Sequence, residues 1–353
     1  MKLEKFLKDT SNRRKYRVDK TFLQDVIRVI LDYQPTDLWE IFKRSDEYFE
    51  GVVAVVENLH DEKLIKVFKN GKFILTPKGK RFANQLIPTK VPKSYKIEYN
   101  ISIPSPLQKI LKKMNKVYKE VNPKDEFEQG SLRPKAAMKK VAYAIHRGDV
   151  AGKHLVCVGD DDLLSLIFGM TGLPKSILVL DIDEDILALV DKYAKNISVP
   201  ITTKLQDLYK PISPKYRWKY DTFFTQPPDT VLGYTLFISR GVETLKKKPG
   251  MIAYGGLTPT GCPRGGLLEI EKINQKMGLL TTDYINKICE YPPLRTEIKK
   301  VEVPSYIPYP PNKMWYVSDL VRYKTTKNTK PYYTKVVKKD IADYKVDALK
   351  YGK

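Results

Sequence analysis

The sequence contains few of the residues that bind metals or form disulfides. It has 3 cysteines and 3 histidines among 353 residues. The spacing of Cys157, Cys262 and Cys289 matches neither a Cys-x-x-Cys metal knuckle nor a disulfide framework, which excludes the small disulfide-rich secreted class. The histidines are too scattered to form a zinc site without help from carboxylates, so we expect no bound metal. This composition fits a reducing cytoplasm.

Long apolar runs are missing as well. No stretch of about 18 uninterrupted apolar residues occurs, so we expect no membrane span. Charged residues interrupt the segment from Met1 to Lys20, where a signal peptide would need an apolar stretch. We therefore expect a cytoplasmic protein. Because 42% of the residues are hydrophobic, the chain can still bury the cores of two domains.

Acidic residues are outnumbered, and the net charge is +22. Such an excess by itself predicts an anionic partner such as nucleic acid. The excess is uneven, however, because residues 151–240 contain 10 basic and 11 acidic residues, whereas residues 301–353 contain 11 basic and 5 acidic ones. Two interpretations of this basic C-terminal tail stay open, a solvated lysine-rich surface and a nucleic-acid site.

Residues 1–90 have the pattern of a small helical domain with a hairpin. Apolar residues at helical spacing indicate three helices, in the ranges 22–30, 38–42 and 52–59. Two apolar runs then flank Asn70-Gly71, which is a strong hairpin signal. Together they predict a winged-helix-like domain. Such domains bind DNA or serve in dimerisation and packing; we favour the second use, under which a homodimer contact would lie here.

The remaining chain is predicted to fold as an α/β domain behind a linker. Residues 91–133 form a linker and connecting helix, because prolines punctuate the stretch from Pro88 to Pro106. Residues 134–300 form the α/β domain, and residues 301–353 the basic tail. Short apolar runs that alternate with helical patterns indicate five strands, at 155–158, 177–180, 201–204, 221–224 and 251–254. This alternation predicts a doubly wound parallel sheet, whose ligands bind beyond the carboxyl ends of the strands.

The first strand is followed by Gly159-Asp160-Asp161-Asp162. A dinucleotide-binding domain would have a glycine-rich turn at this point. Three consecutive carboxylates would repel a pyrophosphate, which excludes a standard dinucleotide site. Helix capping explains one aspartate, and three exceed what a cap needs.

Carboxylates also follow the next two strands. Asp181 lies about 20 residues beyond Gly159, at the offset where an acidic side chain accepts hydrogen bonds from ribose hydroxyls. Asp183 is a second candidate for the same sugar. Asp207 follows the third strand, where adenosine-binding folds often contact the base. These positions predict an adenosine-containing donor.

The fourth strand leads into Thr225-Gln226-Pro227-Pro228-Asp229-Thr230. Two prolines after a buried strand fix a rigid, extended turn. Amino-group methyltransferases place a Pro-Pro-aromatic motif at this point. Here Asp229 replaces the aromatic residue, which favours an ammonium group over a stacked base.

Together the loops predict an adenosyl donor without pyrophosphate and a polycationic amine as acceptor. Carboxylates can pair with protonated amines through charge-assisted hydrogen bonds, and one of them can accept the proton of the attacking nitrogen. Because like charges cluster, the pKa of one member should rise, which suits a base that works near neutral pH.

These motifs, together with Phe127-Glu128-Gln129, resemble the branched-chain polyamine synthases of thermophilic archaea and bacteria, over roughly residues 10–300. The resemblance implies a winged-helix-like domain joined to a Rossmann-like domain of the S-adenosylmethionine-dependent transferase type. It also implies transfer of aminopropyl groups from decarboxylated S-adenosylmethionine to the secondary amine of spermidine. The products would be N4-bis(aminopropyl)spermidine and methylthioadenosine. The donor would be a co-substrate, with no permanently bound cofactor.

The resemblance also implies roles for individual residues. Asp160 would be catalytic and would orient and deprotonate the acceptor nitrogen. The polyamine would be bound by Asp161, Asp162, Glu128, Gln129 and Asp229. The donor would be bound by Gly159, Asp181, Asp183, Asp207, Pro227 and Pro228. The basic tail departs from the family pattern, and we expect no part for it in polyamine binding because lysines repel the substrate.

Two other functions stay open. A nucleic-acid amino-methyltransferase would account for the net charge and for the Pro-Pro loop, but Asp229 and the acidic loop after the first strand are unfavourable for a polyanion. A DNA-binding regulator with a degenerate transferase domain would account for the N-terminal domain alone.

Overall fold

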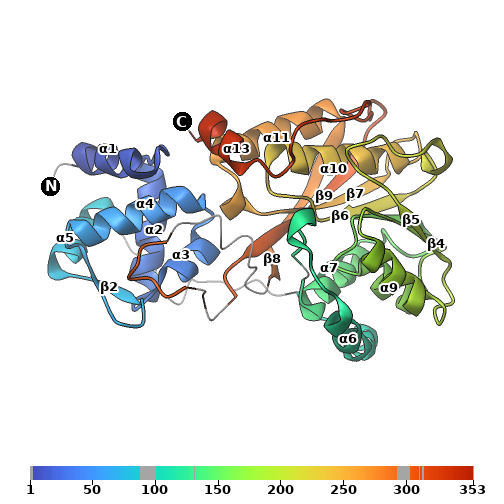
Figure 1. The fold of residues 1–353 in the computed structure, drawn as a ribbon, viewed down its shortest axis with the longest axis horizontal. Coiled ribbons are helices and arrows are strands. Elements are labelled where there is room, and N and C mark those ends of the chain that lie inside the picture. Colours follow the sequence, from blue (N-terminus) through green and yellow to red (C-terminus); the bar gives the residue numbers. More distant parts are fainter. Residues whose placement is uncertain are drawn as a thin grey trace.

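The computed structural model describes residues 3–87, 101–130, 132–291, 303–309, 311 and 314–352. In these residues an N-terminal helical region lies beside a larger α/β domain (Figure 1). Most of the predicted linker from Pro88 to Pro106, namely residues 88–100, lies outside the described residues. None of the helices in the described ranges has the length and apolar character needed to cross a membrane.

The N-terminal region contains the helices and the hairpin that the sequence predicts, with a further helix at each end. Its elements are α1 (Leu3–Arg14), α2 (Lys20–Tyr33), α3 (Leu38–Ser45), α4 (Phe49–Asp61), β1 (Ile65–Val67), β2 (Phe73–Leu75) and α5 (Pro77–Leu86). Asp19 and Asp37 cap α2 and α3 by accepting backbone hydrogen bonds. In the hairpin turn Gly71 has φ +74°, and a Cβ there would lie 1.9 Å from Pro308 Cδ, so only glycine fits.

Helix α4 is covered by α1. Arg14 pairs with Glu57 at 2.5 Å, and Arg13 with Asp61 at 2.8 Å. Between these pairs, Asn58 Nδ2 donates a buried hydrogen bond to Thr10 Oγ1 at 2.7 Å. The side of α4 that carries Glu57 and Asp61 is thus acidic and is covered by α1. In a DNA-binding module of this type the corresponding helix enters the major groove, so the arrangement favours a packing role. The winged-helix assignment itself stays a prediction.

The α/β domain is built on one sheet. Before the sheet come α6 (Ser105–Val117) and α7 (Pro134–His146), with short 3-10 turns at Tyr118–Glu120 and Asp125–Phe127. Then follow β3 (His154–Val158), α8 (Leu164–Thr171), β4 (Ser176–Asp181), α9 (Glu184–Ala194), β5 (Ile201–Leu205), β6 (Thr222–Thr225), α10 (Val231–Thr244), β7 (Ile252–Leu257), α11 (Arg264–Lys276), β8 (Leu279–Glu290), β9 (Val317–Thr325) and α13 (Tyr344–Tyr351).

The strand order is β5-β4-β3-β6-β7-β9-β8. The strands from β3 to β7 pair in parallel, as predicted, and β3 pairs with both β4 and β6. The chain therefore reverses its direction of winding at β3, which creates a switch point beyond the carboxyl ends of β3 and β6.

The sheet extends beyond the predicted domain boundary at residue 300. Strand β9 lies between β7 and β8 and pairs antiparallel with both, so part of the predicted tail belongs to the sheet. This strand was not predicted because the basic residues in the segment indicated a solvated tail. One of them, Arg322, is buried and forms two hydrogen bonds with Asp149, from Nε to Oδ2 at 2.7 Å and from Nη2 to Oδ1 at 2.9 Å.

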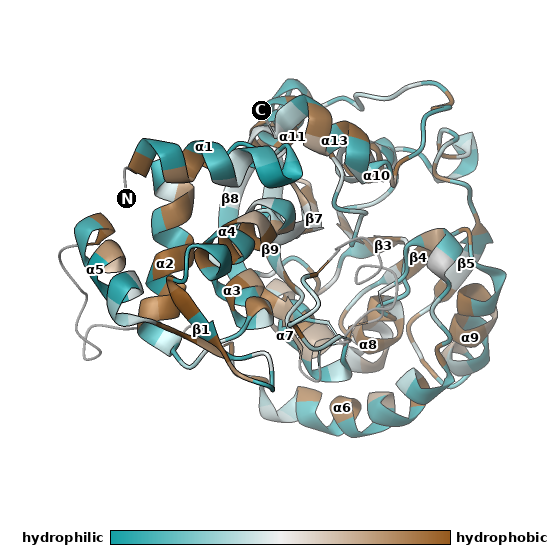
Figure 2. Cartoon of the chain, turned by 60° about the vertical axis from the view of Figure 1, so that its left-hand side comes forward, coloured by the Kyte–Doolittle hydropathy of each residue, from teal (hydrophilic) through white to brown (hydrophobic). Residues whose placement is uncertain are grey.

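Two apolar cores lie on the two faces of the sheet. Leu155 and Cys157 of β3 join the core with α7 and α8, while Val156 and Val158 join the core with α10 and α11. This alternation follows the two-residue period of a strand that is buried on both faces. Helix α8, which is coloured apolar over much of its length, lies between α6 and α9 (Figure 2).

The N-terminal region is docked on the α/β domain by aromatic and ionic contacts. The ring of Trp315, just before β9, lies 5.1 Å from the rings of both Trp39 and Phe42 on α3. Nearby, Lys287 of β8 pairs with Asp46 at 2.8 Å. The first apolar core is continuous across this contact.

Candidate functional site

A cavity of about 420 Å³ opens beyond the carboxyl ends of the parallel strands. The loop after β3 contributes Gly159, and the end of β4 contributes Asp181. Asp207 follows β5, and Gln226 and Pro228 follow β6. The cavity therefore lies at the predicted switch point, and its volume suits a small-molecule site.

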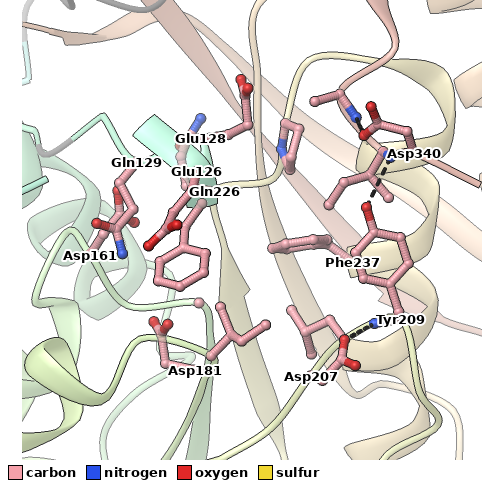
Figure 3. A pocket seen from close by; sticks show the side chains of 17 residues that line it. Glu126, Glu128, Gln129, Asp161, Asp181, Asp207, Tyr209, Gln226, Phe237 and Asp340 are labelled. Atoms are coloured by element: carbon pink, nitrogen blue, oxygen red, sulfur yellow. Dashed lines mark hydrogen bonds between the residues drawn. The ribbon is translucent and has the colours of Figure 1, made fainter. Parts of the chain in front are cut away.

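Acidic side chains line much of this cavity. Its six carboxylates are Glu126, Glu128, Asp161, Asp181, Asp207 and Asp340. No lysine or arginine is found among the described residues that line it. Figure 3 shows Asp161 and Asp181 on one side and Asp340 on the other. Such a wall attracts a cation and repels phosphate.

Other residues of the lining are apolar or aromatic. Phe237 projects from α10, Leu208 and Tyr209 follow β5, and Ile182 follows β4. In Figure 3 the ring of Phe237 points toward the side that carries Asp161 and Asp181, whereas Tyr209 points toward the segment that carries Asp340. Flat apolar surfaces of this kind suit an aromatic base. Phe237 could not be recognised from the sequence, because in α10 it has the pattern of an ordinary apolar position.

The acidic loop after β3 is held by backbone hydrogen bonds. Gly159 has φ +71°, a left-handed conformation that glycine adopts without strain. Asp181 accepts hydrogen bonds from the backbone N–H groups of Asp160 at 2.7 Å and Asp183 at 2.9 Å. Asp161 Oδ2 accepts one from Gly130 N at 3.2 Å. Burial, with the charges of neighbouring carboxylates, raises the pKa of Asp161 well above its ordinary value.

Asp160, the predicted catalytic residue, does not line the cavity. Its carboxylate accepts a hydrogen bond from Ser165 N, with both oxygens at 3.3 Å, and so caps the first turn of α8. The residue is 1% exposed. Burial, reinforced by the charges of Asp181 and Asp162, raises its pKa to about 8.

Asp162 also points away from the cavity. Its Oδ2 lies 3.0 Å from the ammonium of Lys140, and its Oδ1 accepts a hydrogen bond from Leu132 N at 3.0 Å. Lys140 in turn donates to Gln226 Oε1 at 2.6 Å. Asp162 is therefore part of a buried polar contact between two loops.

Asp183, predicted to bind the donor, anchors the segment before α7 instead. It accepts hydrogen bonds from Lys124 Nζ at 2.6 Å and from Gln129 Nε2 at 2.8 Å. Gln129 itself lines the cavity, as does the neighbouring Glu128, whose carboxylate accepts a hydrogen bond from Tyr344 Oη at 3.3 Å.

Asp229, predicted for the polyamine groove, lies behind the Pro-Pro loop. Tyr316 Oη donates a hydrogen bond to Asp229 Oδ2, and both residues are buried. A Cβ on Gly261 would lie 2.7 Å from the same oxygen. Pro228 lines the cavity and Pro227 does not.

The structure thus divides the predicted site residues into two groups. Those that line the cavity are Glu128, Gln129, Gly159, Asp161, Asp181, Asp207 and Pro228. Those that lie behind its wall are Asp160, Asp162, Asp183, Pro227 and Asp229.

The C-terminal segment also contributes to the cavity wall. Asp340, Ile341 and Ala342 line it, and Ile341 N donates to Tyr209 Oη at 3.1 Å. The lysines around Asp340 gave the segment its basic character in the sequence. Within the described residues, no three His, Cys, Asp or Glu side chains are arranged to hold a metal ion.

The sequence pattern of the branched-chain polyamine synthase A C-terminal domain matches residues 109–348. The chain belongs to this family. An N(4)-bis(aminopropyl)spermidine synthase of Thermococcus kodakarensis is 30% identical over 308 residues, which cover 84% of this chain and 86% of the relative. A synthase of the same name from Methanocaldococcus jannaschii is 27% identical over 357 residues, which cover 97% of each chain.

A solved structure has the same fold. The branched-chain polyamine synthase of Thermus thermophilus, in complex with N4-aminopropylspermidine and 5'-methylthioadenosine, superimposes with a TM-score of 0.79. The two chains are 22% identical, and the match covers 98% of each. The predicted Rossmann-like α/β fold is thereby confirmed, and the family predicted from the loop motifs is confirmed by the sequence matches.

Proposed function

We propose that the protein is an aminopropyltransferase that makes branched-chain polyamines. It transfers aminopropyl groups from decarboxylated S-adenosylmethionine to the secondary amine of spermidine. The products are N4-bis(aminopropyl)spermidine and methylthioadenosine. Family membership and the names of the relatives support this assignment.

The observation that carries the proposal is the composition of the cavity wall. Six carboxylates without an accompanying lysine or arginine, among the described lining residues, suit a guest with several positive charges. Spermidine offers three amines, and a charge-assisted hydrogen bond to an ammonium is roughly twice as strong as a neutral one. The apolar side at Phe237 and Leu208 suits the adenine of the donor.

The reaction needs positioning and a proton acceptor. The lone pair of the neutral acceptor nitrogen attacks the aminopropyl carbon bound to the sulfonium. The carbon–sulfur bond breaks, and its electron pair stays on sulfur to give neutral methylthioadenosine. In the first transfer the new ammonium loses its proton and becomes a tertiary amine. In the second transfer the tertiary amine becomes a quaternary ammonium, which has no proton to lose.

We assign the proton acceptor to the loop after β3. The family resemblance implies this role for Asp160, but its carboxylate caps α8 behind the wall. Asp161 is the member of the loop that lines the cavity. Its raised pKa makes it a better proton acceptor than an ordinary aspartate, provided that it is ionised. We therefore propose Asp161 as the base. Asp181 would bind the donor ribose, as the motif position implies.

The direct test is a product assay. The protein is incubated with spermidine and decarboxylated S-adenosylmethionine, and the polyamines are identified by mass spectrometry. We expect products with one and two added aminopropyl groups, together with methylthioadenosine. A parallel incubation with tRNA or DNA and S-adenosylmethionine tests the methyltransferase function. Methylated nucleic acid without any new polyamine would overturn the proposal.

The test variant is Asp161→Asn, and its matched control is Glu271→Gln. Both changes remove one negative charge, but Glu271 is an exposed residue of α11, outside the cavity. Loss of product in D161N with full activity in E271Q would tie the activity to the acidic wall.

A further inference from the structure

Lys140 is a buried lysine that neither the motifs nor the cavity lining include. It lies on α7 and is 2% exposed. Its ammonium contacts Asp162 Oδ2 at 3.0 Å and Gln226 Oε1 at 2.6 Å. Burying an ammonium costs several kcal/mol, and a hydrophobic replacement of a buried ion pair is often neutral or stabilising. Fold stability alone is therefore a weak reason for a lysine at this position.

The two partners of Lys140 belong to the two loops that form the reaction side of the cavity. Asp162 ends the acidic loop after β3, and Gln226 begins the Pro-Pro loop after β6. Gln226 lines the cavity and is closely fitted, because a Cβ on Gly256 would lie 1.8 Å from its Oε1. One ammonium thus fixes the distance between the loops.

Lys140 also lies close to the cavity wall, because Asp162, which its ammonium contacts at 3.0 Å, directly follows Asp161 in the chain. Burial raises the pKa of Asp161, the charges of Asp162 and Asp181 raise it further, and Lys140 acts in the opposite direction. Other titratable groups near this cluster include Tyr118, Cys289 and Tyr291. Burial raises the pKa of each of them, so they stay neutral near neutral pH. Lys140 is therefore a buried cation, among the described residues, that offsets part of the negative charge of these carboxylates.

We propose that Lys140 is a positioning residue for the transfer reaction: it ties the acidic loop to the Pro-Pro loop and keeps Asp161 negatively charged. It acts through Asp162 and Gln226 and does not touch the substrate. The inference rests on the proposed function, because it assumes that an ionised Asp161 accepts the proton.

A purely structural lysine would behave differently. If Lys140 only stabilised the fold, its loss would lower the activity by the same factor at every pH. If it keeps Asp161 ionised, its loss raises the pKa of Asp161. The acidic limb of the kcat profile then moves to higher pH, and raising the pH restores part of the lost rate.

The test compares Lys140→Met, Lys140→Arg and Lys135→Met in full-length protein. Lys135 lies on the same helix but is exposed, so K135M removes a positive charge outside the site and should match the wild type. For K140M we expect kcat to fall about tenfold at pH values on the acidic limb, which corresponds to an upward shift of about one unit in the pKa of Asp161. K140R keeps the charge, and its limb should stay near the wild-type position.

A second change separates the two parts of the inference. Gln226→Leu breaks the tie between the loops but keeps the Lys140–Asp162 pair. We expect it to raise the KM for spermidine without moving the acidic limb. If Q226L leaves KM unchanged, the tie has no part in positioning.

Loss of one partner of a buried pair is strongly destabilising, so K140M can fail to fold. In that case the acidic limb of the kcat–pH profile is compared between Asp162→Asn and the double variant K140M/D162N. Residue 162 is neutral in both of these variants, so they differ only at Lys140. An unchanged pH profile in folded K140M, or in this second comparison, would overturn the inference. Failure of the proposed function is a different result, because the wild type itself would then form no aminopropylated product.

Discussion

The phenol of Tyr316 donates a hydrogen bond to the carboxylate of Asp229, immediately behind the Pro-Pro loop. The Tyr316 ring lies 5.3 Å from that of Trp315, which in turn contacts Trp39 of the N-terminal region. A continuous set of packed side chains therefore connects the N-terminal region with a loop of the cavity. This contact favours a packing role for the N-terminal region over a DNA-binding one.

The first prediction concerns this contact. Tyr316→Phe keeps the ring but removes the only donor that the phenol offers, so the buried Asp229 loses a hydrogen bond. Hydrogen bonds to charged groups contribute about 1.5–3 kcal/mol, and we expect a loss of unfolding free energy of about that size. We also expect a fall in kcat/KM of about tenfold, because a displacement of about 1 Å in a positioning group can cost more than that.

Urea denaturation and steady-state kinetics measure the two effects. Tyr309→Phe is the matched control, since Tyr309 is 47% exposed. Wild-type stability and kinetics in Y316F would show that the hydrogen bond does not support the loop.

The second prediction separates Asp161 from Asp160. General-base catalysis contributes about 10²–10⁴-fold, so D161N should lower kcat for the first transfer by a factor in this range. Asp160→Asn keeps an oxygen that can still accept from Ser165 N, and we expect a smaller loss. The measurement is single-turnover transfer to spermidine. The opposite ranking would support the assignment of the base to Asp160 and would require its side chain to turn toward the cavity.

The third prediction concerns the C-terminal segment. Asp340 lines the cavity opposite Asp161, so Asp340→Asn removes one of the charges that attract the polyamine. We expect KM for spermidine to rise about three- to tenfold, with little change in kcat, because a uniform binding contact is lost. As controls, KM for the donor in D340N and KM for spermidine in E271Q should both match the wild-type values. A fall in kcat at unchanged KM would contradict this role.

The fourth prediction concerns stability and pH. Burial raises the pKa of Glu47 from 4.5 to about 8, although its partner Arg264 opposes the shift. The folded state then holds a proton that the unfolded state releases between these values. The contribution of Glu47 to stability is therefore full below pH 4.5 and is lost as the pH rises to about 8.

Glu47→Gln should remove this dependence. The urea midpoint of E47Q relative to the wild type should increase with pH across this window and stay constant above it. A constant difference between the two proteins at all pH values would show that Glu47 does not titrate in the window.

Much of the fold could be predicted because apolar runs and their spacing determine it. The strands β3 to β7 fall within a few residues of their predicted positions, and the hairpin at Asn70-Gly71 forms as expected. Strands β8 and β9 were missed. Strand β8 has many exposed positions, and β9 contains charged residues, such as Asp319 and Arg322, that form hydrogen bonds with other segments.

The site was predicted as a region but not residue by residue. The sequence shows that carboxylates follow the strands, and Asp161, Asp181 and Asp207 do line the cavity. It does not show which way each side chain of a loop points. That direction depends on distant partners, such as Lys140 for Asp162 and Tyr316 for Asp229. Asp340 was missed because its neighbours in the sequence are lysines.

The place of β9 in the sheet has a consequence for synthesis on the ribosome. In the described sheet β8 pairs only with β9, and β9 is the last strand to be translated. While residues 317–325 are still inside the exit tunnel, β7 has an open edge and β8 has no neighbour. Since nascent domains fold as units, the sheet cannot be completed until residues 317–325 have left the tunnel, and the β7 edge is the segment at risk of aggregation until then.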